Sequence, residues 1–161
     1  MRVSGDMQVR APMELVWSIV SDPERVLDYM SGATRWEVAS EEALGLGARY
    51  RMLFRVGSAE IGGLIEIVEW APPCDLAWTS VTGVDQRGRW RLREGTGGRT
   101  KVEFRLAYGV AGSGLSGWLA ERLAAPIVSG HVRRSLDQLR RLVEHEQLRE
   151  RAAARGGGQR A

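Results

Sequence analysis

The stretch Arg49-Tyr50-Arg51-Met52-Leu53-Phe54-Arg55-Val56 alternates large apolar side chains with arginines. Successive side chains of a β-strand point to opposite faces, so this period of two predicts a strand with one face buried and one in water. The same alternation predicts six further strands, at residues 3–9, 36–38, 61–67, 76–80, 90–92 and 102–108. Short turns join most of them, which favours an antiparallel meander. The adjacent Gly62 and Gly63 predict a bulge or a close approach of two backbones.

Helical patterns lie at the two ends of this run of strands. Ala11-Pro12 begins one short helix and Ser21-Asp22-Pro23-Glu24 begins a second, because proline is tolerated in a first helical turn. A long C-terminal helix is predicted from leucines and isoleucine spaced by four and then from a shifted apolar stripe: Leu115, Leu119, Leu123, Ile127, and Val128, Val132, Leu136, Leu139, Val143. Only this helix is long enough to cover the sheet. We therefore expect an α+β domain in which a curved antiparallel sheet of about seven strands wraps around it.

Length and composition limit the class of protein. The chain has 161 residues, of which 43% are hydrophobic and 27% charged, which favours a single globular domain over disorder. We place this domain at residues 1–148 and a flexible, charged and glycine-rich tail at 149–161. No apolar run reaches the ~18 residues of a membrane span, and the first residues lack an apolar signal core. The single cysteine, Cys74, excludes a disulfide within the chain, and two histidines are few for a metal site. We therefore expect no metal and no cofactor. We expect a cytoplasmic monomer or homodimer.

Five segments, in order along the chain, resemble motifs of the START-like (SRPBCC) superfamily, which includes polyketide cyclases and lipid-transfer proteins. They are residues 9–17 (apolar-x-Ala-Pro-x-x-x-Val-Trp), 21–24 (x-Asp-Pro-Glu), 47–50 (Gly-x-x-apolar), 70–78 (x-x-Pro-Pro-x-x-Leu-x-Trp) and 98–102 (Gly-x-Thr-x-Val). The resemblance implies the helix-grip fold, with a deep apolar cavity between the sheet and the long helix. Members bind lipids, polyketides, isoprenoid quinones or plant hormones there. Some only carry the ligand, and others catalyse cyclisation or dehydration.

The side chains on the inward faces are the candidate ligand contacts. They are Trp36, Tyr50, Met52, Phe54, Ile65, Trp78, Ser80, Trp90, Phe104, Tyr108, Leu119, Leu123 and Ile127. The alternative is that these residues only fill a core. If a cavity exists, Tyr50, Ser80, Trp78 and Tyr108 carry the polar groups that would orient a ligand. The glycine-rich stretch 109–117, ending at Trp118, is either a lid or an ordinary connector.

The sequence shows no nucleophile–base pair, no Gly-x-Ser-x-Gly elbow and no phosphate-binding glycine motif. Tyr50 and His131 are the candidates for proton transfer, and His131 has the alternative of a rim or surface histidine. Our first hypothesis is a non-enzymatic protein that binds a lipid, polyketide or isoprenoid-like molecule. The alternative is a polyketide aromatase/cyclase or dehydratase acting on a carrier-bound polyketide, since ring closure needs little beyond a shaped cavity and a few donors.

Basic side chains, mostly arginines, gather on one face of a predicted strand and its neighbour: Arg87, Arg89, Arg91, Arg93, Lys101 and Arg105. A third hypothesis is a partner-binding module that uses this face, for example to dock an acyl carrier protein. The alternative is a solvated outer face that charge keeps from aggregating. Nucleic acid is not expected as a partner, because no aromatic side chains stand among these arginines to stack on bases.

Overall fold

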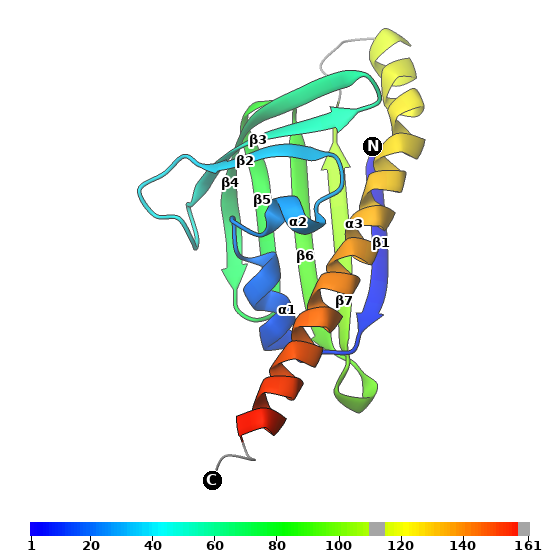
Figure 1. Cartoon of the computed structure of the whole chain (residues 1–161). Coiled ribbons are helices and arrows are strands. Elements are labelled where there is room, and N and C mark those ends of the chain that lie inside the picture. Colours follow the sequence, from blue (N-terminus) through cyan, green and yellow to red (C-terminus); the bar gives the residue numbers. More distant parts are fainter. Residues whose placement is uncertain (110–114, 158–161) are drawn as a thin grey trace.

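The computed structural model describes residues 1–109 and 115–157, and for residues 115–121 it describes the backbone alone. The strands are β1 (Arg2–Val9), β2 (Ala33–Val38), β3 (Arg49–Val56), β4 (Ala59–Ala71), β5 (Asp75–Gly83), β6 (Gln86–Glu94) and β7 (Thr100–Tyr108). The helices are α1 (Met13–Val20), α2 (Val26–Tyr29) and α3 (Leu115–Gly157), with a short 3-10 turn, η1 (Thr96–Gly98), between β6 and β7. The predicted α+β helix-grip fold is confirmed (Figure 1).

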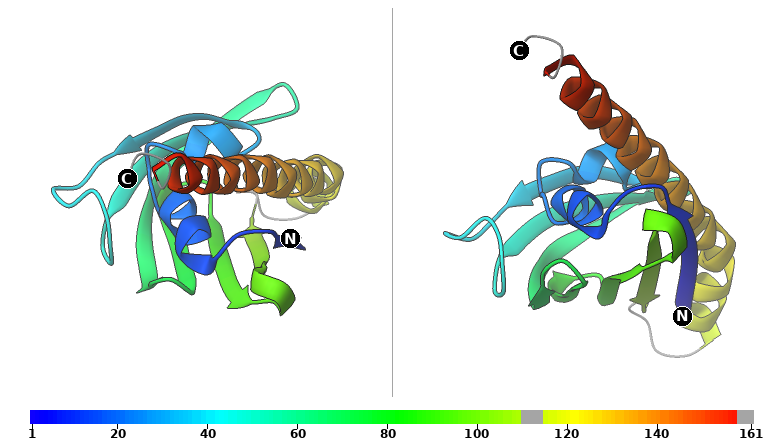
Figure 2. Two further views of the ribbon diagram at one scale, coloured as in Figure 1. Left: turned by 60° about the horizontal axis from the view of Figure 1, so that its bottom comes forward. Right: turned by 90° about the horizontal axis from the view of Figure 1, so that it is seen from below.

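The seven strands form one sheet in the order β1-β7-β6-β5-β4-β3-β2, and every neighbouring pair is antiparallel. Strands β2 to β7 follow one another as a meander because their connections are short. The α1–α2 segment carries the chain from β1 at one edge to β2 at the other. The sheet curls, and α3 crosses its concave side (Figure 2).

The apolar stripe of α3 holds this helix to the rest of the domain. Its members are Val128, Val132, Leu136, Leu139 and Val143, and all are buried. The helix packs chiefly against β1 and α2 rather than against the middle of the sheet. The helix therefore rests on the edge of the curled sheet, and its first half passes over the concave face at a distance.

The short helices α1 and α2 cover the other end of the concave face (Figure 1). Tyr29 of α2 meets the Trp90 ring edge-on at 5.9 Å, and Trp90 stacks on Phe104 at 4.1 Å. Trp36 of β2 stacks on Tyr50 of β3 at 5.6 Å. An aromatic core beneath α1 and α2 thus covers one end of the concave face. At the other end of this face, α3 is the only helix of the described residues that covers the sheet.

Two boundaries differ from the prediction. Helix α2 begins at Val26 and not at Pro23, because the Asp22 carboxylate accepts the Glu24 amide at 2.9 Å and closes a turn before the helix. Helix α3 continues past Leu148 to Gly157. Arginine, glutamate and alanine favour helix, which is the physical reason for the extension. The division into a domain 1–148 and a tail 149–161 stays a prediction; residues 158–161, and residues 110–114 of the proposed lid, lie outside the described part.

The close backbone approach predicted at the paired glycines is confirmed. A Cβ on Gly62 would lie 2.6 Å from the carbonyl oxygen of Met52, and a Cβ on Gly63 would collide with the carbonyl of Thr82. Only glycine lets β3 and β5 come this close to β4 here. No helix in the described ranges is long and apolar enough to cross a bilayer.

Candidate functional site

A cavity of about 670 Å³ lies between the concave face of the sheet and the first half of α3. The β3–β4 hairpin, the β5–β6 turn, β6, β7 and the Met30-Ser31 segment after α2 form its other walls. Its lining residues are Met30, Ser31, Met52, Phe54, Val56, Ala59, Ile61, Gly62, Gly83, Val84, Gln86, Phe104, Leu106, Tyr108, Gly109, Leu123, Ala124, Ile127, Val128, His131, Val132 and Ser135. None of them is an aspartate, glutamate, lysine or arginine, so the cavity wall is apolar with a few neutral polar groups.

Two large apolar side chains of α3 at the cavity are partly exposed to solvent. Leu123 and Ile127 line the cavity, and yet they are 66% and 37% exposed. Ile127 also faces the tip of the β3–β4 hairpin, where a Cβ on Gly57 would lie 3.6 Å from its Cδ1. Large apolar side chains that are exposed to solvent at the edge of a cavity are typical of a surface that binds another apolar molecule.

The predicted ligand contacts divide into two groups. Those that line the cavity are Met52, Phe54, Phe104, Tyr108, Leu123 and Ile127, together with the candidate proton-transfer residue His131. Those that do not line it are Trp36, Tyr50, Ile65, Trp78, Ser80 and Trp90. The side chains of Leu119 and of Trp118, at the end of the proposed lid, lie outside the described residues.

The aromatic residues away from the cavity belong to the core beneath α1 and α2. Trp36, Tyr50, Trp78 and Trp90 border a space of only about 20 Å³, which is room for roughly one water. Trp36 stacks on Tyr50, Trp90 meets Tyr29 of α2, and Trp78 lies against Phe104. Contact of these residues with a ligand stays a prediction.

Tyr50, a candidate for proton transfer, also lies away from the large cavity, and its role in proton transfer stays a prediction. Its hydroxyl donates to the carbonyl oxygen of Ala43 at 2.6 Å, outside the large cavity. Burial, with a smaller effect of the Asp22 carboxylate, raises the pKa of Tyr50 to about 12. The Ser80 hydroxyl is hydrogen-bonded within the protein. It accepts from the backbone N–H of Gln86 at 3.2 Å and donates to the Asp85 carboxylate at 3.4 Å.

A polar cluster forms where α3 passes the end of α2. The Nδ1 atom of His131 lies 2.9 Å from the Ser31 hydroxyl and 3.2 Å from Nη2 of Arg134. Arg134 also donates from Nε to the Ser31 oxygen at 3.2 Å. The backbone amide of Ser31 donates to Ser135 Oγ at 2.9 Å, which ties this segment to the helix. The fold thus brings a serine hydroxyl to a histidine 100 residues away, a pair that the sequence pattern did not reveal.

His131 is a neutral imidazole near pH 7. Burial, followed by the positive charge of Arg134, lowers the pKa of His131 below its ordinary value of 6.5, although a hydrogen bond to the Arg55 backbone opposes this. A guanidinium can only donate, so Nδ1 is the acceptor and the ring proton sits on Nε2. Gly32 fits against this ring: with φ at +87°, a Cβ there would lie 2.8 Å from Cε1 of the imidazole.

Sequence reasoning missed three polar residues of the lining: Ser31, Gln86 and Ser135. Gln86 could have been predicted from the sequence. Counting back by two from Trp90 along β6 leads through Gly88 to Gln86, which therefore lies on the same inward face. Its amide nitrogen contacts the Met52 sulfur at 3.4 Å. Ser31 and Ser135 carried no such signal, since one follows a short helix and the other stands beside an apolar stripe.

The arginine-rich face is the outer face of the sheet, and cross-strand carboxylates neutralise much of it. Asp75 accepts from Arg91 at 3.2 Å and from Arg93 at 2.9 Å, and Arg89 donates to Glu69 at 2.6 Å. Partial burial raises the pKa of Asp75, but the hydrogen bonds from Arg93 and Arg91 outweigh it and the net shift is downward. This pairing favours a solvated, ion-paired face. Docking of an acyl carrier protein there stays a prediction.

Solved structures share this architecture. TTHA0849 from Thermus thermophilus superposes with a TM-score of 0.77 at 23% identity, over 89% of this chain and 97% of that chain. The Zhui aromatase/cyclase from Streptomyces sp. R1128 gives 0.74 at 20% identity, over 89% and 93%. The di-domain ARO/CYC StfQ from the steffimycin biosynthetic pathway gives 0.62 at 16% identity, over 92% of this chain and 46% of that one. At these identities the likeness establishes the fold alone.

No curated protein sequence matches the chain. A family model does match, over residues 1–144, and its description is polyketide cyclase / dehydrase and lipid transport. The match spans all seven strands, both short helices and most of α3. The chain therefore belongs to the polyketide cyclase / dehydrase and lipid transport family.

Proposed function

We propose that this protein binds a hydrophobic small molecule, of the lipid, polyketide or isoprenoid kind, in the cavity between the sheet and α3. The observation that carries this proposal is the cavity itself. Its volume of about 670 Å³ falls within the ~300–1,000 Å³ usual for small-molecule sites. Apolar walls with a few polar groups suit a ligand that is largely hydrocarbon.

The expected driving force is the removal of apolar surface from water. At about 25 cal/mol per Å², burying roughly 300 Å² of ligand surface gives ~7 kcal/mol before the losses of association. Leu123 and Ile127, left partly in water at the rim, would be covered in the same step. The exposed side chains thus add to the affinity of a ligand that reaches the opening.

The test is to fill the cavity. Ala124 of α3 lines it, whereas its neighbour Ala125 does not. Ala124→Trp should weaken the binding of the neutral fluorescent probe N-phenyl-1-naphthylamine by at least about tenfold, because an indole would occupy the site. Ala125→Trp is the matched control and should bind like the parent chain. Equal binding by both variants, or no binding by the parent, would contradict the proposal.

A second candidate function is that of an aromatase/cyclase on a carrier-bound polyketide. The position of His131 favours it, since a neutral imidazole on the cavity wall can accept and return a proton. Among the structural relatives, the aromatase/cyclases are consistent with such chemistry.

The test of this second function uses a minimal polyketide synthase that supplies a carrier-bound poly-β-ketone. His131→Gln should change the distribution of cyclised products. Tyr50→Phe is the control and should leave it unchanged, because the Tyr50 hydroxyl donates to Ala43 outside the cavity. Identical products from His131→Gln and the parent would remove His131 from any catalytic role.

A further inference from the structure

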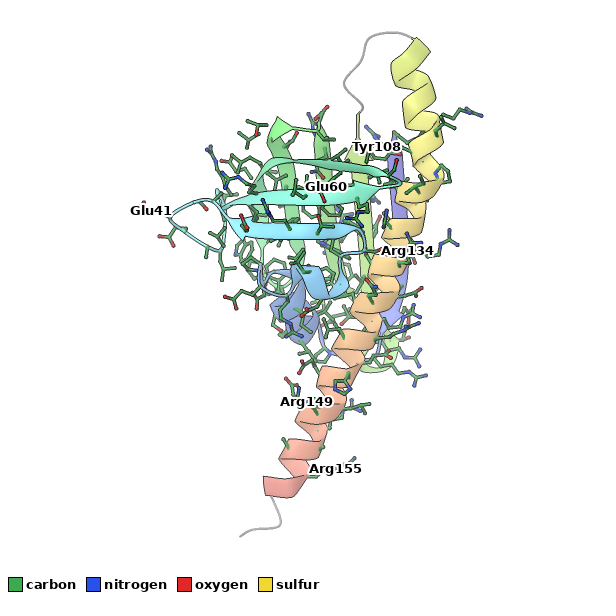
Figure 3. The ribbon with its side chains drawn as sticks, turned by 45° about the horizontal axis from the view of Figure 1, so that its top comes forward. Glu41, Glu60, Tyr108, Arg134, Arg149 and Arg155 are labelled. Carbon is green, nitrogen blue, oxygen red and sulfur yellow. The ribbon has the colours of Figure 1, made fainter. Side chains whose placement is uncertain are left out.

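Arg134 lies on α3 (Figure 3), and its two described hydrogen-bond partners are neutral side chains that line the cavity. Its guanidinium donates to Ser31 Oγ and His131 Nδ1, each at 3.2 Å. Among the residues whose side chains are described, no carboxylate forms an ion pair with it, whereas Arg25, Arg49 and Arg89 all have such partners. Its charge is therefore uncompensated by this part of the chain.

The two acceptors of Arg134 belong to the cavity. Ser31 and His131 both line it, whereas Arg134 is exposed, so the guanidinium lies one hydrogen bond from the cavity wall on its solvent side. A guanidinium carries five N–H groups, and two of them are used here, which leaves donors for a further acceptor. The Ser31 hydroxyl is in reach of the same acceptor. Neither Ser31 nor neutral His131 supplies negative charge.

The described lining of the cavity offers no other partner for a charged group. Among the residues whose side chains are described, it contains no lysine, arginine, aspartate or glutamate, and its other polar members are neutral. Burying an unpaired charge against such walls is strongly unfavourable. A ligand with one ionised end would thus have a single favourable orientation, with that end at Arg134 and its apolar part inside.

We propose that the ligand is an amphipathic carboxylic acid, whose carboxylate binds Arg134 and the Ser31 hydroxyl while its hydrocarbon part fills the cavity. This inference rests on the proposed ligand-binding function and narrows its ligand class. A carboxylate matches the planar fork of a guanidinium and can accept two parallel hydrogen bonds. It also supplies the counter-charge that the described residues do not. An alcohol or an ester of the same chain length satisfies the apolar walls but leaves the cation unpaired.

The experiment compares three ligands of one chain length: dodecanoic acid, dodecan-1-ol and methyl dodecanoate. Each displaces N-phenyl-1-naphthylamine from the protein at about pH 8, where the carboxylic acid is ionised and histidine is neutral. The parent chain should bind the acid at least about tenfold more tightly than the other two, since charge-assisted hydrogen bonds are the strong ones.

Arg134→Gln should remove this preference and leave the affinity for the alcohol unchanged. Arg133→Gln is the matched control and should keep the preference, because Arg133 is exposed like Arg134 but, among the described side chains, has no hydrogen bond to a cavity-lining residue. Equal affinity for the three ligands, or a preference that survives Arg134→Gln, would overturn the inference and leave the cavity as a neutral-ligand site. Failure of the probe and of all three ligands to bind would instead contradict the proposed function itself.

Discussion

Replacing Gly32 by alanine should destabilise the protein by two separable effects. Gly32 has φ at +87°, where an L-residue is strained by roughly 1–2 kcal/mol. In addition, the new Cβ would lie 2.8 Å from Cε1 and 2.9 Å from Nδ1 of His131, so the imidazole must move. Forcing a group into a packed site costs typically about 1–3 kcal/mol. The sum predicts a loss of roughly 2–5 kcal/mol in the free energy of unfolding.

Gly47 provides the matched control. Its φ is +84°, almost that of Gly32, and a Cβ there would have nothing within 4 Å. Gly47→Ala should therefore show the backbone strain alone, roughly 1–2 kcal/mol. Urea denaturation followed by tryptophan fluorescence measures both variants. The difference between them isolates the contact with His131.

Combining Gly32→Ala with His131→Ala completes a double-mutant cycle. Removing the imidazole should relieve the clash, so the pair should be less destabilising than the sum of its members by ~1–3 kcal/mol. If Gly32→Ala and Gly47→Ala lose the same free energy, or if the cycle shows additivity, the imidazole does not pack on Gly32. The placement of His131 at the cavity wall would then be refuted.

Three further changes test the core and the titration of the site. Thr100→Val should lower the free energy of unfolding by about 1–3 kcal/mol in urea denaturation, because the buried Thr100 hydroxyl donates to the Ala11 carbonyl at 2.7 Å and its loss leaves that carbonyl unpaired. Leu139→Ala should cost about 2–5 kcal/mol by the same measurement, since Leu139 is fully buried, whereas Leu148→Ala, at a side chain 65% exposed, should change stability by less than ~0.5 kcal/mol. The pKa of His131 is lower in the folded chain than its ordinary 6.5, so as the pH falls the unfolded chain binds the proton first. The free energy of unfolding should thus decline between about pH 7 and pH 5, and His131→Gln should show a shallower decline; an equal decline in both would contradict the lowered pKa.

The fold was predictable because its signals are local and repeat along the chain. The alternation in Arg49–Val56 indicates which face of the strand is buried, and it does so without information on which element packs against that face. The buried stripe of α3, predicted from its spacing, is the same kind of signal. The paired Gly62 and Gly63 predicted a close backbone approach because the absence of a side chain is itself visible in the sequence. Element boundaries were less certain, since helix ends such as those of α2 and α3 depend on weak propensities.

The candidate site was only half predictable, and the reason lies in what covers each face. Periodicity placed Tyr50, Trp90 and Phe104 on the inward side of the sheet, but it contains no information on whether a side chain faces another side chain or an empty space. That was decided when α1 and α2 packed on one end of the concave face and left the other to α3 (Figure 1). The same inward pattern therefore became an aromatic core at one end and a cavity wall at the other.

The amino-acid sequence by itself determined the strands, the long helix, the family and the apolar character of the interior, because periodicity, turn chemistry and short motifs are properties of neighbouring residues. Only the tertiary structure decided that Ser31 meets His131 and Arg134 across about 100 residues of chain, and that the outer arginines of β6 pair with Asp75 on β5 and with Glu69 on β4, one strand further along the sheet. Such contacts depend on strand register and on how a helix crosses a sheet. These are set by the packing of the whole domain, and no local stretch of sequence contains them.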